Sequence, residues 1–177
     1  MIPATQKKLR EARFFLWCLR RRDRVAPPEP EDFEFYLSAF LSAARSVTFA
    51  LENEEEAKYK EWRGTWATLI TAEEQKFVDA MVEQRNIAQK RGGVPVAVDW
   101  EFVPVIQAKR DERGQPMYGL QWFGPVTAPM PQVGQPVHSI TLGTGQVEAL
   151  ATCERYLNML ERLVADFLKT YAPGNAV

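Results

Sequence analysis

The residues best suited to chemistry are Arg85 and Asn86, late in a segment with helical periodicity. On a helix Arg85 falls between Met81 and Val78, so its guanidinium should face the interior. An unpaired buried charge is costly, so Arg85 needs a carboxylate partner or an anionic ligand. A guanidinium beside an amide suits a phosphate group. The pair therefore predicts either a structural ion pair or a polar cleft that binds phosphate.

Three further cations belong to the same binding hypothesis. Lys90 and Arg91 follow in the last turn of the segment, and Arg45 lies at the edge of an earlier apolar helix. Each could pair with a carboxylate, or reach the surface through its long aliphatic stem. The candidate carboxylate partners for the arginines are Glu11, Glu34 and Glu83.

The rest of the inventory offers little for catalysis. His138 is the one histidine, so no His-based zinc site or Cys–His nucleophile pair is expected, and we expect His138 to be structural or exposed. There is no Gly-rich phosphate loop and no nucleophile elbow. Cys18 and Cys153 lie among apolar residues, which predicts free thiols in a reducing compartment. We expect no catalytic residues, metal or cofactor.

The chain is organised around a helix at residues 32–53. Between Phe33 and Leu51 only Glu34 and Arg45 are charged, which predicts a helix that is covered on every side. One face is broad and apolar. The other carries short side chains that allow a close helix contact, within the chain or across a homodimer. These residues are Ser38, Ala39, Ser42, Ala43, Ser46 and Ala50, flanked by Phe35 and Phe49.

Four more helices surround this one. The first, at residues 6–24, ends in a run of arginines that indicates a solvated helix end or a nucleic-acid contact. A third carries an aromatic stripe of core type at Tyr59, Trp62 and Trp66. The fourth starts at a capping box, Thr71 to Glu74, runs to about Lys90 and ends at two glycines. The last covers residues 146–171.

A change of period before the last helix predicts β structure. Residues 94–107 and 117–123 alternate, which indicates a hairpin with Gly114 at its tip. The Pro-rich residues 124–136 predict an irregular loop, and residues 137–142 a third short strand. The expected fold is mainly α, an antiparallel bundle of about five helices with a β-hairpin inserted before the last one. We expect a single domain, 1–177, with 94–142 as an excursion within it.

Composition limits the partners. The chain has 177 residues with 22 Lys and Arg against 23 Asp and Glu, a net charge of −1. Overall charge therefore gives no bias toward nucleic acid or membrane, and such binding must be local. No stretch approaches the roughly 20 apolar residues of a membrane span, and no leader cleavage site follows the first apolar run. A cytoplasmic, bacterial-type setting is expected.

Together these features resemble the HEPN superfamily of bacterial all-helical proteins. The resemblance rests on YLSAFLSAARSVTF (Tyr36 to Phe49), the short first helix and the Arg-Asn pair, and covers roughly residues 6–91. It implies a homodimer, and many members are metal-independent ribonucleases of toxin–antitoxin or phage-defence systems. Their motif is an Arg, often followed by Asn, with a His a few residues later. Arg85 and Asn86 match, but Lys90, Arg91 and Gly92 stand where the His would fall.

This departure bears on activity. The family His is thought to act as general acid or base, and Lys or Arg shares a proton poorly near pH 7. We therefore expect a non-catalytic homodimer that holds RNA or a nucleotide at Arg85 and Asn86, beside Lys90 and Arg91. The alternatives are a structural or protein-interaction scaffold, with a protein partner at the β-hairpin, and an active ribonuclease that uses Lys90 or Tyr36.

Overall fold

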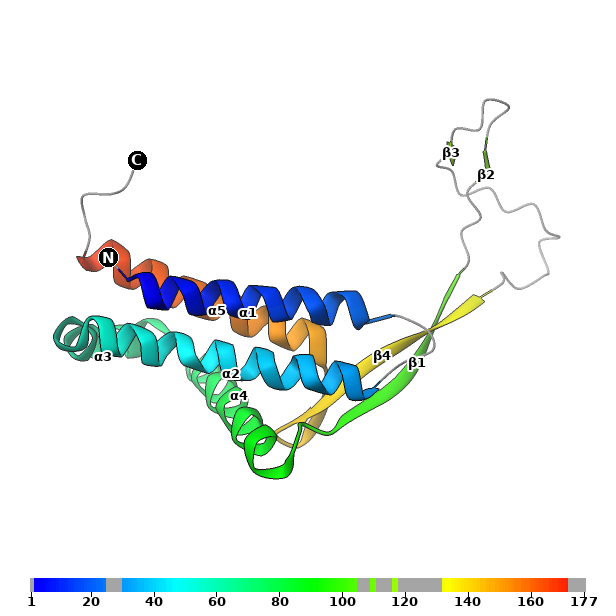
Figure 1. Ribbon diagram of the computed structural model, residues 1–177, viewed down its shortest axis with the longest axis horizontal. Coiled ribbons are helices and arrows are strands. Elements are labelled where there is room, and N and C mark those ends of the chain that lie inside the picture. The colour runs from blue at the N-terminus through cyan, green and yellow to red at the C-terminus, as the bar shows by residue number, and fades with distance from the viewer. Residues whose placement is uncertain (1, 25–29, 105–108, 111–115, 118–131, 172–177) are drawn as a thin grey trace.

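The computed structural model in Figure 1 describes residues 2–24, 30–104, 109–110, 116–117 and 132–171. These residues form five helices and five strands, which confirms a mainly helical chain with β structure before the last helix. The helices are α1 (Pro3–Arg22), α2 (Pro30–Glu54), α3 (Glu56–Leu69), α4 (Ala72–Arg91) and α5 (Ala149–Tyr171). The strands are β1 (Val96–Pro104), β2 (Lys109–Arg110), β3 (Pro116–Met117), β4 (Gln132–Leu142) and β5 (Gly145–Glu148).

α1 and α2 form an antiparallel hairpin with the most extensive helix contact in the fold (Figure 1). At one end Glu54 accepts hydrogen bonds from the backbone of Ala4 and Thr5. At the other end Arg22 pairs with Asp32 at 2.8 Å. These contacts fix the two helices over their whole length.

The apolar face of α2 forms the axis of the core, as its periodicity predicts. The fully buried residues are Phe33, Leu37, Phe40, Leu41, Ala44, Val47 and Leu51. On the small-residue face Ala43 is also buried, but Phe35 is 60% exposed and Phe49 46% exposed. The prediction that this helix is covered on every side is therefore wrong for the single chain. A helix with few charged residues is expected to have apolar surroundings, but its sequence does not say whether the same chain or a second molecule provides them.

α3, α4 and α5 complete the bundle around α2, and α5 also packs against α1. Trp62 of α3 packs edge-on against Phe167 of α5, with ring centroids 5.4 Å apart, and its indole N–H donates to Asp166 at 2.9 Å. The aromatic stripe is thus core packing, as predicted. No helix among the described residues is long and apolar enough to cross a membrane.

The strand pairing corrects the predicted hairpin. β1 pairs antiparallel with β4 and β4 with β5, so the sheet order is β1-β4-β5. Among the described residues the partner of β1 is thus β4, and Met117 pairs with Lys109 instead; residues 118–123 and the expected tip, Gly114, lie outside the described residues. Residues 132–136, expected as loop, are strand. Pro136 fits there because β5 covers only Ser139–Leu142, so no described strand pairs with the second edge of β4 at Pro136.

The last helix begins later than predicted, because a two-residue turn and a short strand precede it. Gly143 has φ +62°, the conformation that the first central residue of a tight hairpin turn requires. Gly145–Glu148 return as β5, so α5 starts at Ala149 rather than at Gln146.

β1 and β4 form a ribbon whose far end extends beyond the helices (Figure 1). Residues directly opposite one another point to the same side, so Val98, Trp100 and Phe102 share a face with His138, Pro136 and Gly134. This face is buried at His138 but more than half exposed at Trp100 and Phe102. The ribbon therefore has a root held by the bundle and a tip with two uncovered aromatic rings.

Candidate functional site

α4 holds Arg85 and Asn86 in place because both of its ends are well defined. The Thr71 hydroxyl accepts from the Glu74 amide at 3.1 Å, and the Glu74 carboxylate accepts from the Thr71 amide at 2.9 Å. This is the predicted capping box. Gly92 ends the helix in the left-handed conformation with φ +80°. The buried Gln84 donates to the Thr141 carbonyl at 2.8 Å, which fixes the rotation of α4 next to Arg85.

The Arg85 guanidinium is half-buried and uncommitted. Its Nε is buried without a hydrogen-bond partner, and Nη1 makes a long bond of 3.4 Å to the Asn86 amide oxygen. Within the described part of the chain, no carboxylate pairs with it. Glu34 instead accepts from the Val96 amide at 3.3 Å, and Glu11 pairs with Lys8 at 2.7 Å. The ion-pair alternative therefore finds no partner in that part of the chain.

The other predicted cations do not join Arg85. Lys90 and Arg91 are exposed in the last turn of α4, where cations complement the helix dipole. Arg45 donates to the Thr48 hydroxyl at 3.0 Å, and its guanidinium lies 4.2 Å from the centroid of the Phe49 ring. The structure thus brings Arg85 and Asn86 together, while no hydrogen bond or ion pair between described residues connects them to Arg45, Lys90 or Arg91.

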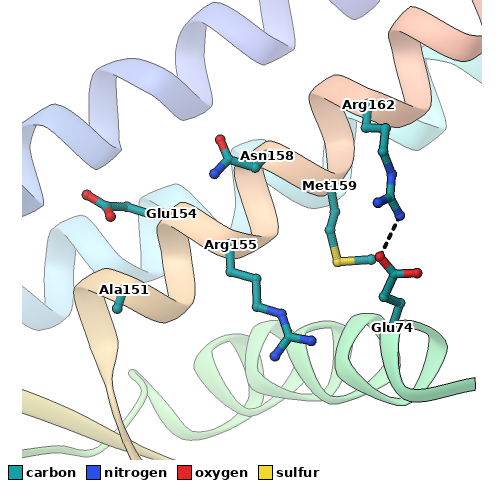
Figure 2. A pocket seen from close by; sticks show the side chains of 7 residues that line it. All are labelled: Glu74, Ala151, Glu154, Arg155, Asn158, Met159 and Arg162. Atoms are coloured by element: carbon teal, nitrogen blue, oxygen red, sulfur yellow. Dashed lines mark hydrogen bonds and ion pairs between the residues drawn. The ribbon is translucent and has the colours of Figure 1, made fainter. Parts of the chain in front are cut away.

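Figure 2 shows a pocket between α4 and α5, and its charged side chains are already paired. Arg162 contacts Glu74 at 2.7 Å. Arg155 contacts Glu73 at 3.3 Å and lies 4.3 Å from the centroid of the Phe77 ring. Hydrogen bonds from Thr71 and Arg162 lower the pKa of Glu74 below its ordinary value. These contacts fasten α5 to α4, so the arginines of this pocket have less capacity for a ligand than Arg85.

A second pocket lies between α1 and α5 and is paired in the same way. Arg13 contacts Glu161 at 2.7 Å and Arg20 contacts Glu154 at 2.8 Å. Two arginines near the end of the first helix thus serve packing: Arg20 holds α5 and Arg22 holds α2.

Sequence reasoning missed a buried polar pair between His138 and Asp23. Nδ1 of His138 donates to Asp23 Oδ1 at 3.1 Å, and the ring stacks on Phe33 with centroids 4.0 Å apart and planes at 3°. His138 is 1% exposed, and its Nε2 is buried without a partner. One side chain of β4 therefore contacts both the end of α1 and the start of α2.

Arg24 extends this pair to the sheet. Its guanidinium contacts Asp23, Glu101 of β1 and Glu148 of β5. The hydrogen bond with Glu101 raises the pKa of Arg24 above its ordinary value. Arg24 adopts φ +63°, uncommon for a residue with a side chain, as α1 ends. No spacing rule links residues 23, 101, 138 and 148, so the sequence carried no signal for this cluster.

The cysteines behave as predicted. Cys18 and Cys153 are free and buried, and burial raises the pKa of the Cys153 thiol. In the described ranges, no group of three or more His, Cys, Asp or Glu side chains is placed to hold a metal ion.

Comparison of the chain with protein-family models, with curated proteins and with solved structures gives no match. The resemblance to the HEPN superfamily therefore stays a hypothesis that rests on the residues named above.

Proposed function

We propose that this chain is a non-catalytic, HEPN-like binding protein that holds a phosphate group of RNA or of a nucleotide at Arg85 and Asn86. The observation that carries the proposal is the uncommitted guanidinium of Arg85. A buried donor without a partner costs about 1–3 kcal/mol, and a phosphate oxygen would satisfy Nε once the half-buried side chain turns toward the surface. Arg85 can present two parallel N–H groups to a phosphate, and the Asn86 amide can add a third donor.

The state of His138 supports a non-catalytic role. A general acid or base must reach the proton that it transfers, and this ring is enclosed by Phe33 and Asp23. Lys90 is exposed, Tyr36 packs against the core, and neither side chain makes a hydrogen bond or ion pair with a described residue. A cleavage assay on structured RNA tests this point directly: product formation would show an active ribonuclease.

Binding is best measured by fluorescence anisotropy at low salt, where counterion release most favours phosphate contacts. We expect Arg85→Ala to weaken the binding of labelled RNA or nucleotide about tenfold, the scale of one lost charged hydrogen bond. Arg85→Lys should recover part of the loss, since it restores the charge but not the fork. Arg63→Ala, an exposed cation on α3, is the control. No binding by the wild type would refute the proposal.

A second candidate, a protein-interaction role, is favoured by the uncovered aromatic residues. We propose that α2 mediates a homodimer, since Phe35 and Phe49 are exposed on either side of half-buried Ser38 and Ser42. Exposed apolar groups next to short side chains let a second helix approach closely. The ribbon tip, with Trp100 and Phe102, is the place for a protein partner at the predicted hairpin.

A further inference from the structure

The outward face of α1 carries cations and aromatic rings on one stripe. The members recur at spacings of three and four residues, so they share a helix face over about 21 Å. We call this set the basic–aromatic stripe, and all of it is exposed: Lys7, Arg10, Phe14, Trp17 and Arg21. Phe14 is 55% exposed and Trp17 49% exposed, although α1 has a separate apolar face buried in the core. These two rings are therefore not needed for packing.

The two rings and one guanidinium of the stripe lie together on the helix face. Phe14 and Trp17 are stacked, with centroids 6.1 Å apart and planes at 28°. The Arg21 guanidinium lies 4.8 Å from the centroid of the Trp17 ring. Because one helix carries all three side chains, binding here requires little ordering of the protein backbone.

Positive charge is concentrated on this helix although the whole chain is slightly acidic. α1 contains seven Lys and Arg and one acidic residue, Glu11. Arg13, Arg20 and Arg22 pair with carboxylates of α5 and α2, and Lys8 pairs with Glu11. Lys7, Arg10 and Arg21 make no ion pair with any residue that the structure describes. The stripe thus contains the cations of α1 that make no ion pair with the described residues.

We propose that the basic–aromatic stripe binds single-stranded nucleic acid. Bases would stack on Phe14 and Trp17, and phosphates would contact Lys7, Arg10 and Arg21. A polyanion with stackable faces is the ligand class that matches both features. A second copy of the chain does not match, since two such stripes would bring like charges together. A membrane surface matches poorly because the broad apolar face of α1 is buried.

This surface is separate from Arg85. α1 packs on α2 and α5, whereas Arg85 belongs to α4, which packs on α2 and β4. The inference goes beyond phosphate binding at Arg85 and does not depend on it. Variants of α1 and of Arg85 can therefore be tested independently.

The test is fluorescence anisotropy with a fluorescein-labelled single-stranded RNA of about 20 nucleotides, long enough for the site sizes usual for such proteins. We expect Phe14→Ala/Trp17→Ala to weaken binding at least about tenfold through lost stacking. Arg10→Ala/Arg21→Ala should also weaken it and should lower the slope of log K against log salt by about 1.4. Trp100→Ala/Phe102→Ala and Arg63→Ala/Lys76→Ala, which remove exposed rings and cations elsewhere, should keep the wild-type affinity.

Three results would overturn the inference. The first is no binding by the wild type at low salt. The second is an equal loss in the control variants, which would mean diffuse electrostatic attraction. The third is wild-type binding by both α1 variants, whether or not Arg85→Ala weakens it, since the ligand would then lie elsewhere. Loss in the α1 variants with Arg85→Ala unchanged would support the stripe and refute RNA binding at Arg85.

Discussion

α1 and α2 lie side by side and share one core, yet their exposed faces differ in charge. α1 has seven cations and one acidic residue, whereas α2 has five acidic residues and one cation, Arg45. On α1 the exposed rings of Phe14 and Trp17 stand among Lys and Arg. On α2 Phe35 and Phe49 flank short neutral side chains. Exposed aromatic rings alone do not identify a partner, but the charges beside them indicate which class of molecule could bind there.

The position of the charges along α2 sharpens this difference. The acidic residues of α2 lie at its two ends, and Arg45 is the only charged residue between Glu34 and Glu52. A second copy could therefore approach the middle of α2 without strong repulsion. The same approach at α1 would oppose Lys and Arg. Nucleic acid on α1 and a second protein on α2 are thus the two complementary proposals.

The largest effect is expected at His138, which joins the end of α1 to the start of α2. His138→Ala removes a buried ring from Phe33 and leaves the Asp23 carboxylate without this donor. Together the cavity and the unsatisfied carboxylate should cost about 3 kcal/mol. For a chain of this size the melting temperature should fall by about 6–12 °C. Thermal unfolding followed by circular dichroism measures the change.

Phe102→Ala provides the control for His138→Ala because both residues lie on one face of the ribbon. Phe102 is largely exposed, so its removal should change the free energy of unfolding by less than about 0.5 kcal/mol. Equal melting temperatures for wild type and His138→Ala would mean that the ribbon root does not hold the helix pair together.

Local patterns predicted the helices, and contacts between distant residues escaped prediction. The Thr71 capping box, the Gly92 stop and the α2 core stripe depend on neighbours within one or two turns, so the sequence contains them. The pairing of β1 with β4 joins residues separated by a long connection, and alternation alone does not choose between two candidate strands. The prolines of residues 124–136 indicated a loop, and this prediction failed at residues 132–136 because the sequence does not show where a strand edge lacks a neighbour that needs a backbone N–H.

The residues of the candidate site that are neighbours in sequence could be predicted, whereas their contacts with distant residues could not. Arg85 and Asn86 were named from helix geometry, and their half-buried, adjacent placement follows from it. The sequence could not choose among the candidate partners Glu11, Glu34 and Glu83, and none of them pairs with Arg85: Glu34 accepts from the Val96 amide and Glu11 pairs with Lys8. The His138–Asp23 pair joins two helix ends and a strand, and each residue alone looked ordinary.

A smaller effect is expected from a charge placed on the α2 face. Phe35→Glu should raise the dissociation constant of a homodimer about tenfold, since a carboxylate would replace a ring that a second copy covers. Phe14→Glu on α1 is a matched control with a similarly exposed ring and should leave the dimer unchanged. Sedimentation equilibrium at tens of micromolar measures both, a range in which micromolar dimers are populated. A monomeric wild type would refute dimerisation through α2.

At the C-terminal end of α2 the carboxylate of Glu54 contacts the start of α1. α1 has no acidic residue in its first turn and no side-chain cap of its own. Glu54 supplies both by accepting from the Ala4 amide at 2.6 Å, the Thr5 amide at 2.8 Å and the Thr5 hydroxyl at 2.7 Å. Burial alone would raise the pKa of Glu54, but these hydrogen bonds outweigh it and lower the pKa below the ordinary value of 4.5.

Glu54→Gln should therefore lower the free energy of unfolding by about 1 kcal/mol at neutral pH, the usual cost of losing a helix cap. A depressed carboxyl pKa stabilises the fold above the unfolded value of 4.5 and loses this effect as pH falls through the folded value. The gap between wild type and variant should thus close in acid. Urea titrations at pH 7 and about pH 3 measure it, with Glu52→Gln as the control. A gap that is the same at both pH values would show that the Glu54 charge does not stabilise α1.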